Sequence, residues 1–411
     1  MIKMNDKTKK ILIVTHQYLP HTSPRTTRWK LIVDELVSMG HEVTVITGTK
    51  QVKKEKNIIY IGNRTSSNIV NQVRKRSNNL SGSSVIKKLF YKFLKKIYRI
   101  VIKIFAWPDY SMFWLLSIYR QRKKLNLDYD LMISVSLPFS SHIAAYILNK
   151  KNNKEWLMDI GDPFTLKKDA PENNKILYGL LNKYYEHKFY NLATKIIFTH
   201  EDSMSAHINH FNINPEKTFI GNPISEFKEE IFSSSIKYNY KLNPIKFGYF
   251  GVFTKGVRSP KNFINHLEGI ENIEFHWYVN EDSKNEITKY SNNSTSFFHS
   301  LINREEALKR MADSVHCLLS IGNLNTTQIP SKVIEYISTG KPVIHFSEIE
   351  NDPVKKIAKN FNNLFILSEG TSKKDFFNEL NEYYDNINSF NKEYFVQNYT
   401  ANSIAKILDL I

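Results

Sequence analysis

The segment 329–344, with the sequence IPSKVIEYISTGKPVI, constrains the fold of this chain more than any other segment. Pro330 fixes the backbone for a first helical turn, and Ser331 can accept hydrogen bonds from free amides there. Gly340 ends the helix, and the apolar run after it predicts a buried strand. The N-terminus of such a helix favours an anion such as a diphosphate, and Glu335, about one turn inside, could accept hydrogen bonds from a ribose diol. An ordinary turn with a surface glutamate is the competing interpretation.

The composition indicates a folded protein of about two or three domains, because 411 residues with 41% apolar and 13% aromatic side chains can bury substantial cores. The single cysteine, Cys317, lies in an apolar run and is expected to be a buried thiol. One cysteine excludes disulfides within the chain and a cysteine metal cluster, which fits a reducing cytoplasm. The polar start of the sequence, followed by a short apolar strand, does not predict a signal peptide.

The formal net charge of +17 indicates an acidic partner, and nucleic acid, anionic lipid and phosphorylated substrates all fit it. The segment 85–107 has no acidic residue and carries seven Lys and Arg residues among apolar residues at helical spacing. So many charges exclude a membrane span, but they suit a helix in the interface of an anionic leaflet. The lysines expected to contact the membrane are Lys88, Lys92, Lys95 and Lys96. The alternatives are a core-packed helix with a solvated basic face and, less favoured because the chain has no zinc-finger, KH or RRM signature, an RNA-binding helix.

The order of apolar runs predicts two series of strands that alternate with helices, and hence mainly parallel, doubly wound sheets. In the first series an amphipathic helix over about 23–39 follows the first strand, and Gly40 ends it. The strands predicted in this series are 10–15, 41–47, 58–61, 131–135, 156–160, 195–199 and 218–220. Those of the second series are 245–250, 273–279, 295–299, 315–320 and 342–346. The polar, charged stretch between the two series predicts an interdomain linker over 229–243.

Ligands of open α/β sheets bind beyond the carboxyl ends of the strands, and three loops of this chain qualify. They are the loop 16–25, the loop 251–258 and the loop that contains Pro330. The loop 251–258 has glycines for close backbone approach, and its cations Lys255 and Arg258 suit phosphate oxygens. Together with the helix after Pro330, this loop predicts a diphosphate site.

These segments resemble a known family. The segment 330–336 followed by 340–344 is similar to the donor-site helix of GT-B fold glycosyltransferases of family 4, which are retaining, metal-independent enzymes that use nucleotide sugars. The segments 248–251 and 258–260 resemble the basic loop of that family, which holds the diphosphate. Further similar segments follow in the expected order along nearly the whole chain: 18–29, 40–43, 108–114, 137–142, 159–164 and 222–223. The opening segments resemble a subgroup that is common in bacterial surface-polysaccharide synthesis.

The resemblance implies a GT-B fold, in which two doubly wound Rossmann-like domains face each other across a cleft. We expect an acceptor-side domain over 1–228 with a basic amphipathic insertion at about 68–125, then the linker 229–243. A nucleotide-sugar-binding domain over 244–390 and a C-terminal helix over 391–411 that returns to the first domain complete the expected organisation. The expected partners are a nucleotide sugar, most frequently a UDP-sugar in this family, a glycan or polyprenyl-linked acceptor and an anionic membrane surface, but no nucleic acid. No cofactor or metal is expected, and the implied location is the inner face of the plasma membrane.

The expected mechanism follows from the charge that develops when the bond between sugar and diphosphate breaks. A positive potential at the leaving diphosphate lowers the barrier, and Lys255 and Arg258, with the helix terminus at Ser331, are the candidates for it. The resemblance implies retention of configuration, with the departing phosphate helping to deprotonate the acceptor. It also implies that His142 contacts sugar hydroxyls, while Asp162 could orient the acceptor. The competing interpretation of His142 is a histidine at the start of a helix whose hydrogen bonds are made by the backbone. That of Asp162 is an ordinary turn residue.

Two further groups of residues are expected at the site. Those at the donor are Glu335, Thr327, Pro330, Ser331, Lys332 and Gly251. Those on the acceptor side of the cleft are His16, Ser23 and Arg25, although Arg25 could instead form a pair on the helix surface.

Two positions depart from the family pattern. The family often has a glutamate at the position of Thr327, where it contacts the donor sugar, and relatives commonly carry arginine at the position of Gly161. We interpret both as features of specificity. A non-catalytic scaffold with the same fold and a sugar-nucleotide epimerase are the alternative functions.

Overall fold

The computed structural model describes residues 8–21, 23–51, 55–62, 93, 104–167, 171–237, 244–253, 256–267, 272–291, 295–326, 328–385 and 390–411. The chain forms two compact units. The first comprises Met1–Gly221 with Leu408–Ile411, and the second comprises Asn222–Ile407. Most of the basic segment 85–107, including Lys88, Lys92, Lys95 and Lys96, lies outside the described residues.

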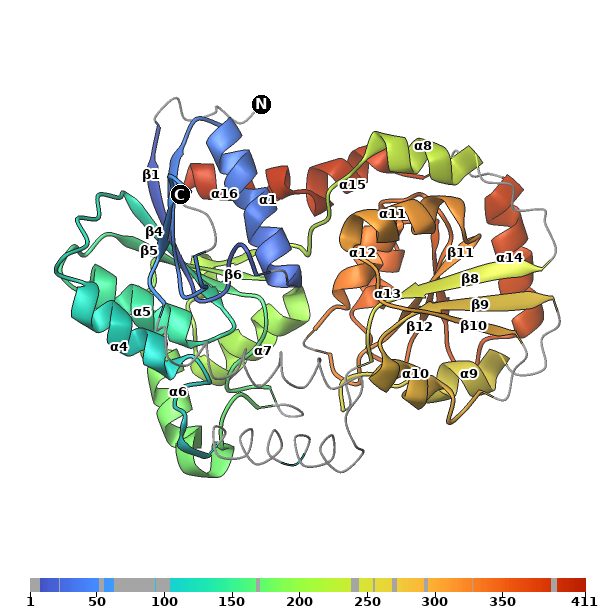
Figure 1. Cartoon of the computed structure of the whole chain (residues 1–411), viewed down its shortest axis with the longest axis horizontal. Helices are drawn as coiled ribbons and strands as arrows, with labels where there is room; N and C mark the ends of the chain where they lie inside the picture. The colour runs from blue at the N-terminus through green and yellow to red at the C-terminus, as the bar shows by residue number, and fades with distance from the viewer. Residues whose placement is uncertain are drawn as a thin grey trace, which may run out of the picture. The chain divides into compact units, whose positions relative to one another are not determined.

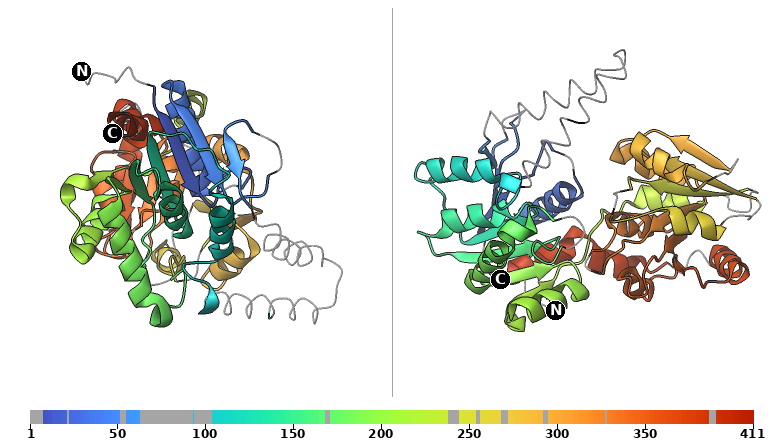
Figure 2. Two further views of the ribbon diagram at one scale, coloured as in Figure 1. Left: turned by 90° about the vertical axis from the view of Figure 1, so that its left-hand side faces the viewer. Right: turned by 90° about the horizontal axis from the view of Figure 1, so that it is seen from below.

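The first unit is built on a seven-stranded sheet in the order β3-β2-β1-β4-β5-β6-β7, with every neighbouring pair parallel. Its strands are β1 (Lys10–Thr15), β2 (Glu42–Thr47), β3 (Ile58–Tyr60), β4 (Leu131–Ser136), β5 (Glu155–Ile160), β6 (Lys195–Phe198) and β7 (Thr218–Ile220). Its helices are α1 (Pro24–Ser38), α4 (Met112–Gln121), α5 (Ser140–Asn149), α6 (Lys175–Leu192) and α7 (Glu201–Phe211), with a 3₁₀ turn at Pro215–Lys217. Figures 1 and 2 show these helices around the sheet.

Local sequence explains the central elements of this unit. Ser23 caps α1 by accepting a hydrogen bond from the amide of Thr26, and Pro24 fits the first turn. All six residues of β4 are buried, as expected for a central strand with helices on both faces. One hydrophobic core joins α4, α5, α6 and α7 to the sheet, and the rings of Phe139 and Phe164 stack within it.

The second unit has a six-stranded sheet in the order β10-β9-β8-β11-β12-β13, again with every described pair parallel. Its strands are β8 (Ile245–Phe250), β9 (Ile273–Tyr278), β10 (Ser296–His299), β11 (Cys317–Ile321), β12 (Val343–Phe346) and β13 (Leu364–Leu367). Its first helices are α8 (Glu229–Lys237), α9 (Lys261–Leu267), α10 (Glu281–Ile287) and α11 (Arg304–Asp313). The others are α12 (Ser331–Ile337), α13 (Val354–Ala358), α14 (Lys373–Asp385), α15 (Lys392–Tyr399) and α16 (Ala401–Leu410), which ends in the first unit. One core packs α11, α12 and α13 on one face of the sheet, and another packs α9, α10 and α14 on the other face (Figure 1).

The predicted strands are confirmed to within two residues at either end, and so is the helix after β1. The structure adds β13, which the sequence analysis did not predict. The last residues, Leu408–Ile411, group with the first unit, where Asp409 lies 3.3 Å from Nε2 of His41. No described helix combines the length and the hydropathy that crossing a bilayer would need.

The segment expected to be a linker is helical over much of its length, because 229–237 forms α8. Its apolar residues Ile231 and Phe232 pack against the core of the second unit, while Glu229 and Glu230 are exposed. The ring of Phe232 fills the space where Gly340 has no side chain, since a Cβ at Gly340 would lie 2.5 Å from it. The units also divide after Gly221, whereas the expected first domain extends to residue 228.

Candidate functional site

The strand order of the second sheet reverses between β8 and β11, and the loops that follow these two strands meet there. The amide of Leu324 donates to the carbonyl of Val257 at 2.8 Å and so joins the two loops. Such a switch point, at the carboxyl ends of parallel strands, is where doubly wound sheets bind ligands.

Arg258 lies at this switch point, as the sequence analysis expected of a phosphate-binding cation. Its guanidinium donates to Oδ1 of Asn323 from Nη2 at 2.9 Å and from Nε at 3.3 Å. Nη1 lies 3.5 Å from the hydroxyl of Tyr249, whose pKa is raised by burial and only partly lowered again by Arg258. Asn323 is in turn fixed by its own donation to the carbonyl of Gln328 at 3.0 Å. The amide therefore orients the guanidinium without neutralising its charge.

The glycines of the loop after β8 differ in what their backbone conformations require. Gly256 has a φ of +80°, which favours glycine, whereas a Cβ at Gly251 would make only ordinary contacts of 3.7 Å or more. Gly251 directly follows β8, and its amide donates to the carbonyl of Tyr278. Lys255 lies outside the described residues.

Glu335 is held as an ionised carboxylate in α12. It is 6% exposed, and it accepts hydrogen bonds from Nε of Arg304 at 2.9 Å and from Nζ of Lys332. Burial on its own would raise the pKa of Glu335, but Lys332 and Arg304 together outweigh burial and lower it. The carboxylate expected to bind a ribose is thus already paired with two cations.

Arg304, the first residue of α11, is a site residue that the sequence analysis missed. It connects Glu335 to Glu226, whose Oε2 lies 3.4 Å from Nη1. No motif marks it in the sequence, because its position depends on how α11 packs beside α12.

The helix α12 is anchored to the end of β8. The hydroxyl of Tyr336 accepts a hydrogen bond from the amide of Phe250 at 2.9 Å and lies 3.2 Å from the carbonyl of the same residue. Pro330, expected in the first turn of the helix, directly precedes α12 and is buried. Thr327 and the side chain of Ser331 lie outside the described residues. The expected donor residues that are described thus lie around one end of the sheet.

The first unit has a corresponding switch point between β1 and β4. Arg25, near the start of α1, donates from Nη2 to Oδ2 of Asp162 at 2.5 Å and from Nη1 to the carbonyl of Leu137. Its Nε lies 3.9 Å from the point where a Cβ would sit at Gly161. Arg25 therefore pairs at the carboxyl ends of the strands and covers the place that a side chain at position 161 would occupy.

The two expected histidines of the first unit are neutral; His142 is fully buried and His16 is half-buried. His142 has no exposed surface, and burial, aided by the charge of Arg25, lowers its pKa to about 3. Its Nδ1 lies 2.7 Å from the hydroxyl of Ser134, so its partner is a side chain and not the backbone. Burial likewise lowers the pKa of His16 to about 4, and the His16 ring packs edge-on against Trp114. Ser23, the third acceptor-side candidate besides His16 and Arg25, caps α1.

Metal binding finds no support in the part of the chain that the structure describes, where no group of three His, Cys, Asp or Glu residues is placed to hold an ion.

No family model and no curated protein sequence matches this chain. Solved structures do match it over nearly its whole length. HepE of Anabaena in complex with UDP-glucose has a TM-score of 0.56 at 12% identity, covering 98% of this chain and 100% of HepE. WaaG, a glycosyltransferase involved in lipopolysaccharide biosynthesis, has a TM-score of 0.54 at 14% identity, covering 96% and 95% of the two chains. A putative UDP-N-acetylglucosamine 2-epimerase from Listeria monocytogenes has a TM-score of 0.53 at 11% identity, covering 98% and 95%.

The chain has the GT-B fold. Its two parallel sheets, each with helices on both faces, are the two Rossmann-like domains that the sequence predicted. This GT-B fold carries a transferase in one of the similar structures and a putative epimerase in another. The activity of this chain therefore has to be argued from its own site.

Proposed function

We propose that this protein is a glycosyltransferase that moves a sugar from a UDP-sugar to a glycan or lipid-linked saccharide, with retention of configuration. The observation that carries the proposal is the cation at the switch point of the second unit. Arg258 is oriented by the neutral amide of Asn323, and among the described residues no carboxylate forms an ion pair with it. A fixed and uncompensated positive charge of this kind suits a diphosphate that gains charge as the sugar departs.

The nucleoside would bind beside Arg258, at the end of β8 and α12. Glu335 is ionised there, and a carboxylate has acceptor capacity beyond its bonds to Arg304 and Lys332, so it can also accept from a ribose diol. Three of the similar structures, all of HepE of Anabaena, contain UDP or UDP-glucose, which supports a uridine nucleotide as the donor.

The chemical step requires a good leaving group more than a protein nucleophile. One well-placed donor at the diphosphate lowers the barrier by about 3 kcal/mol, and we assign this role to Arg258, with Lys255 as a second cation. We assign no carboxylate as nucleophile, and the departing phosphate takes the proton of the acceptor hydroxyl, which gives retention. Neither a cofactor nor a metal is part of the proposal.

The acceptor would bind to the first unit, where Arg25 and Asp162 form a fixed ion pair at the carboxyl ends of the strands. Both members of the pair carry hydrogen-bonding groups that suit sugar hydroxyls. We do not extend this role to His142, because its ring is fully buried. A role in surface polysaccharide synthesis, with the protein held at the inner face of the plasma membrane, accords with the name of WaaG and with the basic segment 85–107.

The test is calorimetry of UDP, GDP, ADP and CMP with the wild-type protein and with Glu335→Ala. We expect selective binding of UDP and at least a tenfold weaker affinity in the variant, since a hydrogen bond to a charged group contributes about 1.5–3 kcal/mol. Glu305→Ala removes an exposed carboxylate from α11 and serves as the matched control. Absence of binding for all four nucleotides would contradict the proposal and favour a scaffold. UDP release that needs no acceptor and yields an isomerised sugar would favour an epimerase.

A further inference from the structure

The helix α6 exposes several large apolar side chains on its outward side and buries polar side chains on its inward side. Ile176 is 95% exposed and Leu180 is 88% exposed, while Leu177 and Tyr184 are each 59% exposed. These residues follow one another at helical spacing, so they form one continuous surface, which we call the α6 apolar face. Clustered apolar exposure on this scale marks an interaction surface on a folded protein, whereas single exposed apolar residues do not.

The inward side of α6 explains why the helix cannot turn this surface into the core. Asn182 is buried and accepts a hydrogen bond from the indole of Trp107 at 3.0 Å. Glu186 is also buried, and it accepts from the amide of Thr165 at 3.0 Å and from the hydroxyl of Tyr190 at 2.7 Å. Rotating α6 would expose an apolar core and leave these polar partners unsatisfied. The outward position of the apolar residues is therefore fixed by the packing.

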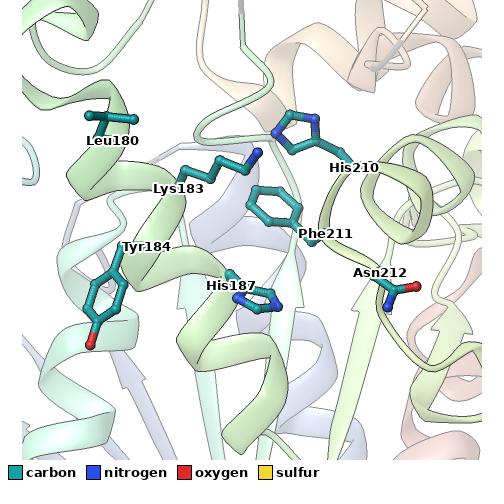
Figure 3. Close-up of a pocket in the computed structure, with 7 residues that line it drawn as sticks. All are labelled: Leu180, Lys183, Tyr184, His187, His210, Phe211 and Asn212. Atoms are coloured by element: carbon teal, nitrogen blue, oxygen red, sulfur yellow. The ribbon is translucent and has the colours of Figure 1, made fainter.

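A groove of about 430 Å³ runs beside the α6 apolar face, between α6 and the end of α7 (Figure 3). Leu180 and Tyr184 line it together with three nitrogen-bearing side chains, Lys183, His187 and His210. A groove with an apolar wall and several possible donors suits an anionic group attached to an apolar body.

Among the residues that the structure describes, the exposed charge on α6 is positive. Its only acidic residue is the buried Glu186, while Lys183 is exposed. Glu172, which precedes the helix, is paired with Lys167 at 2.8 Å. The face therefore presents apolar side chains flanked by cations, which complements an anionic lipid surface. A symmetric contact with a second copy would instead bring the cations of two identical faces together.

We propose that the α6 apolar face docks the protein on a bilayer of anionic lipid, with a lipid headgroup phosphate in the adjacent groove. The helix would lie in the plane of the interface, with Ile176 and Leu180 at the acyl boundary and Lys183 at the headgroups. Phe105, 70% exposed, adds to the apolar surface close to α6, since the carbonyl of the preceding Ile104 accepts from the hydroxyl of Tyr178 at 3.0 Å. This docking surface deepens the proposed function, on which its interpretation as a membrane contact partly rests.

The test is co-sedimentation of the full chain with vesicles of phosphatidylcholine alone or mixed with phosphatidylglycerol. We expect sedimentation only with the mixed vesicles and at least a tenfold weaker partitioning of the double variant Ile176→Glu with Leu180→Glu. The matched control is Val37→Glu with Leu301→Glu, at positions that are 48% and 50% exposed elsewhere on the molecule. This control should sediment like the wild-type protein. Lys183→Gln should reduce the preference for the anionic vesicles.

Four outcomes distinguish docking on lipid from other occupants of the α6 apolar face and from a failure of the proposed function. Loss of a dimer in the double variant by light scattering, with no sedimentation of the wild-type protein, would show that a second copy covers the face and would overturn the proposal. A markedly lower thermal midpoint of the double variant would overturn it too, because it would mean that another part of the chain covers the face. Inorganic phosphate that binds without affecting sedimentation would assign the groove to a free anion. Wild-type sedimentation without UDP binding would support the docking surface and contradict the proposed transferase.

Discussion

Substitution of Arg258 by alanine is the sharpest test of the donor site. The guanidinium is half-buried and is fixed at 2.9 Å from Oδ1 of Asn323, so its position needs no adjustment when a diphosphate arrives. A unit charge about 4 Å away at an effective dielectric of about 20 interacts by about 4 kcal/mol, and water recovers part of this in the variant. A net loss of about 3 kcal/mol in the transition state, relative to the free protein and donor, corresponds to roughly a hundredfold lower kcat/KM.

The ground state should lose less than the transition state. A charged hydrogen bond contributes about 1.5–3 kcal/mol, so Arg258→Ala should bind UDP about 10- to 100-fold more weakly. Arg258→Lys keeps the positive charge but loses the planar guanidinium that Asn323 orients. Its affinity for UDP should therefore lie between those of the wild-type protein and Arg258→Ala. Lys261→Ala is the matched control, because it removes one exposed cation from the start of α9, three residues along the chain.

The assays are calorimetry with UDP and release of UDP from the donor sugar that the nucleotide panel identifies. Thermal unfolding of each variant shows whether the loss of the Asn323 contact, a charged hydrogen bond worth about 1.5–3 kcal/mol, is the only structural effect. The reasoning would be refuted if Arg258→Ala bound UDP as tightly as Lys261→Ala. The cation at the switch point would then have a structural role only.

Two further predictions concern stability. Burial lowers the pKa of Lys341, which donates to the carbonyls of Ala312 and Val315, to about 7. The unfolded chain therefore binds one more proton than the folded chain above about pH 7, and stability should rise by up to about 1.4 kcal/mol per pH unit from there to about pH 10. Lys341→Met should abolish this slope in urea unfolding, and an unchanged slope would show that other groups produce it. A Cβ at Gly48 would overlap the ring of His16, so Gly48→Ala should destabilise the first unit by about 1–3 kcal/mol in thermal unfolding, whereas an unchanged Tm would mean that the ring moves freely.

Sequence patterns were sufficient for most of the sheet, because buried parallel strands are continuous apolar runs between turn signals. They did not predict α8, where the apolar residues Ile231 and Phe232 pack against the core but the glutamates and serines around them are typical of a linker. The short strand Leu364–Leu367 was not predicted, because four residues between loops are too few to show a hydrophobic periodicity.

The site was predicted only as far as local motifs extend. Arg258 and Glu335 belong to recognisable segments, and the structure shows what each of them contacts. Asn323 and Arg304, the residues that orient them, lie far along the chain from their partners or on a neighbouring helix. Their roles depend on which loops meet at the switch point, and this is a property of the strand order and not of any one segment.

Each unit has an arginine at the switch point of its sheet, but the charge of the arginine is neutralised in the first unit and not in the second. In each, an arginine that follows the first strand of the sheet bonds to an oxygen in the loop after the strand at which the order reverses. In the first unit Arg25 donates to the carbonyl of Leu137 and also pairs with Asp162, so its charge is neutralised. In the second unit Arg258 bonds to the amide of Asn323, and no described carboxylate pairs with it. A compensated pair suits a neutral sugar and a free cation suits a diphosphate, which is the division of labour that a transferase requires.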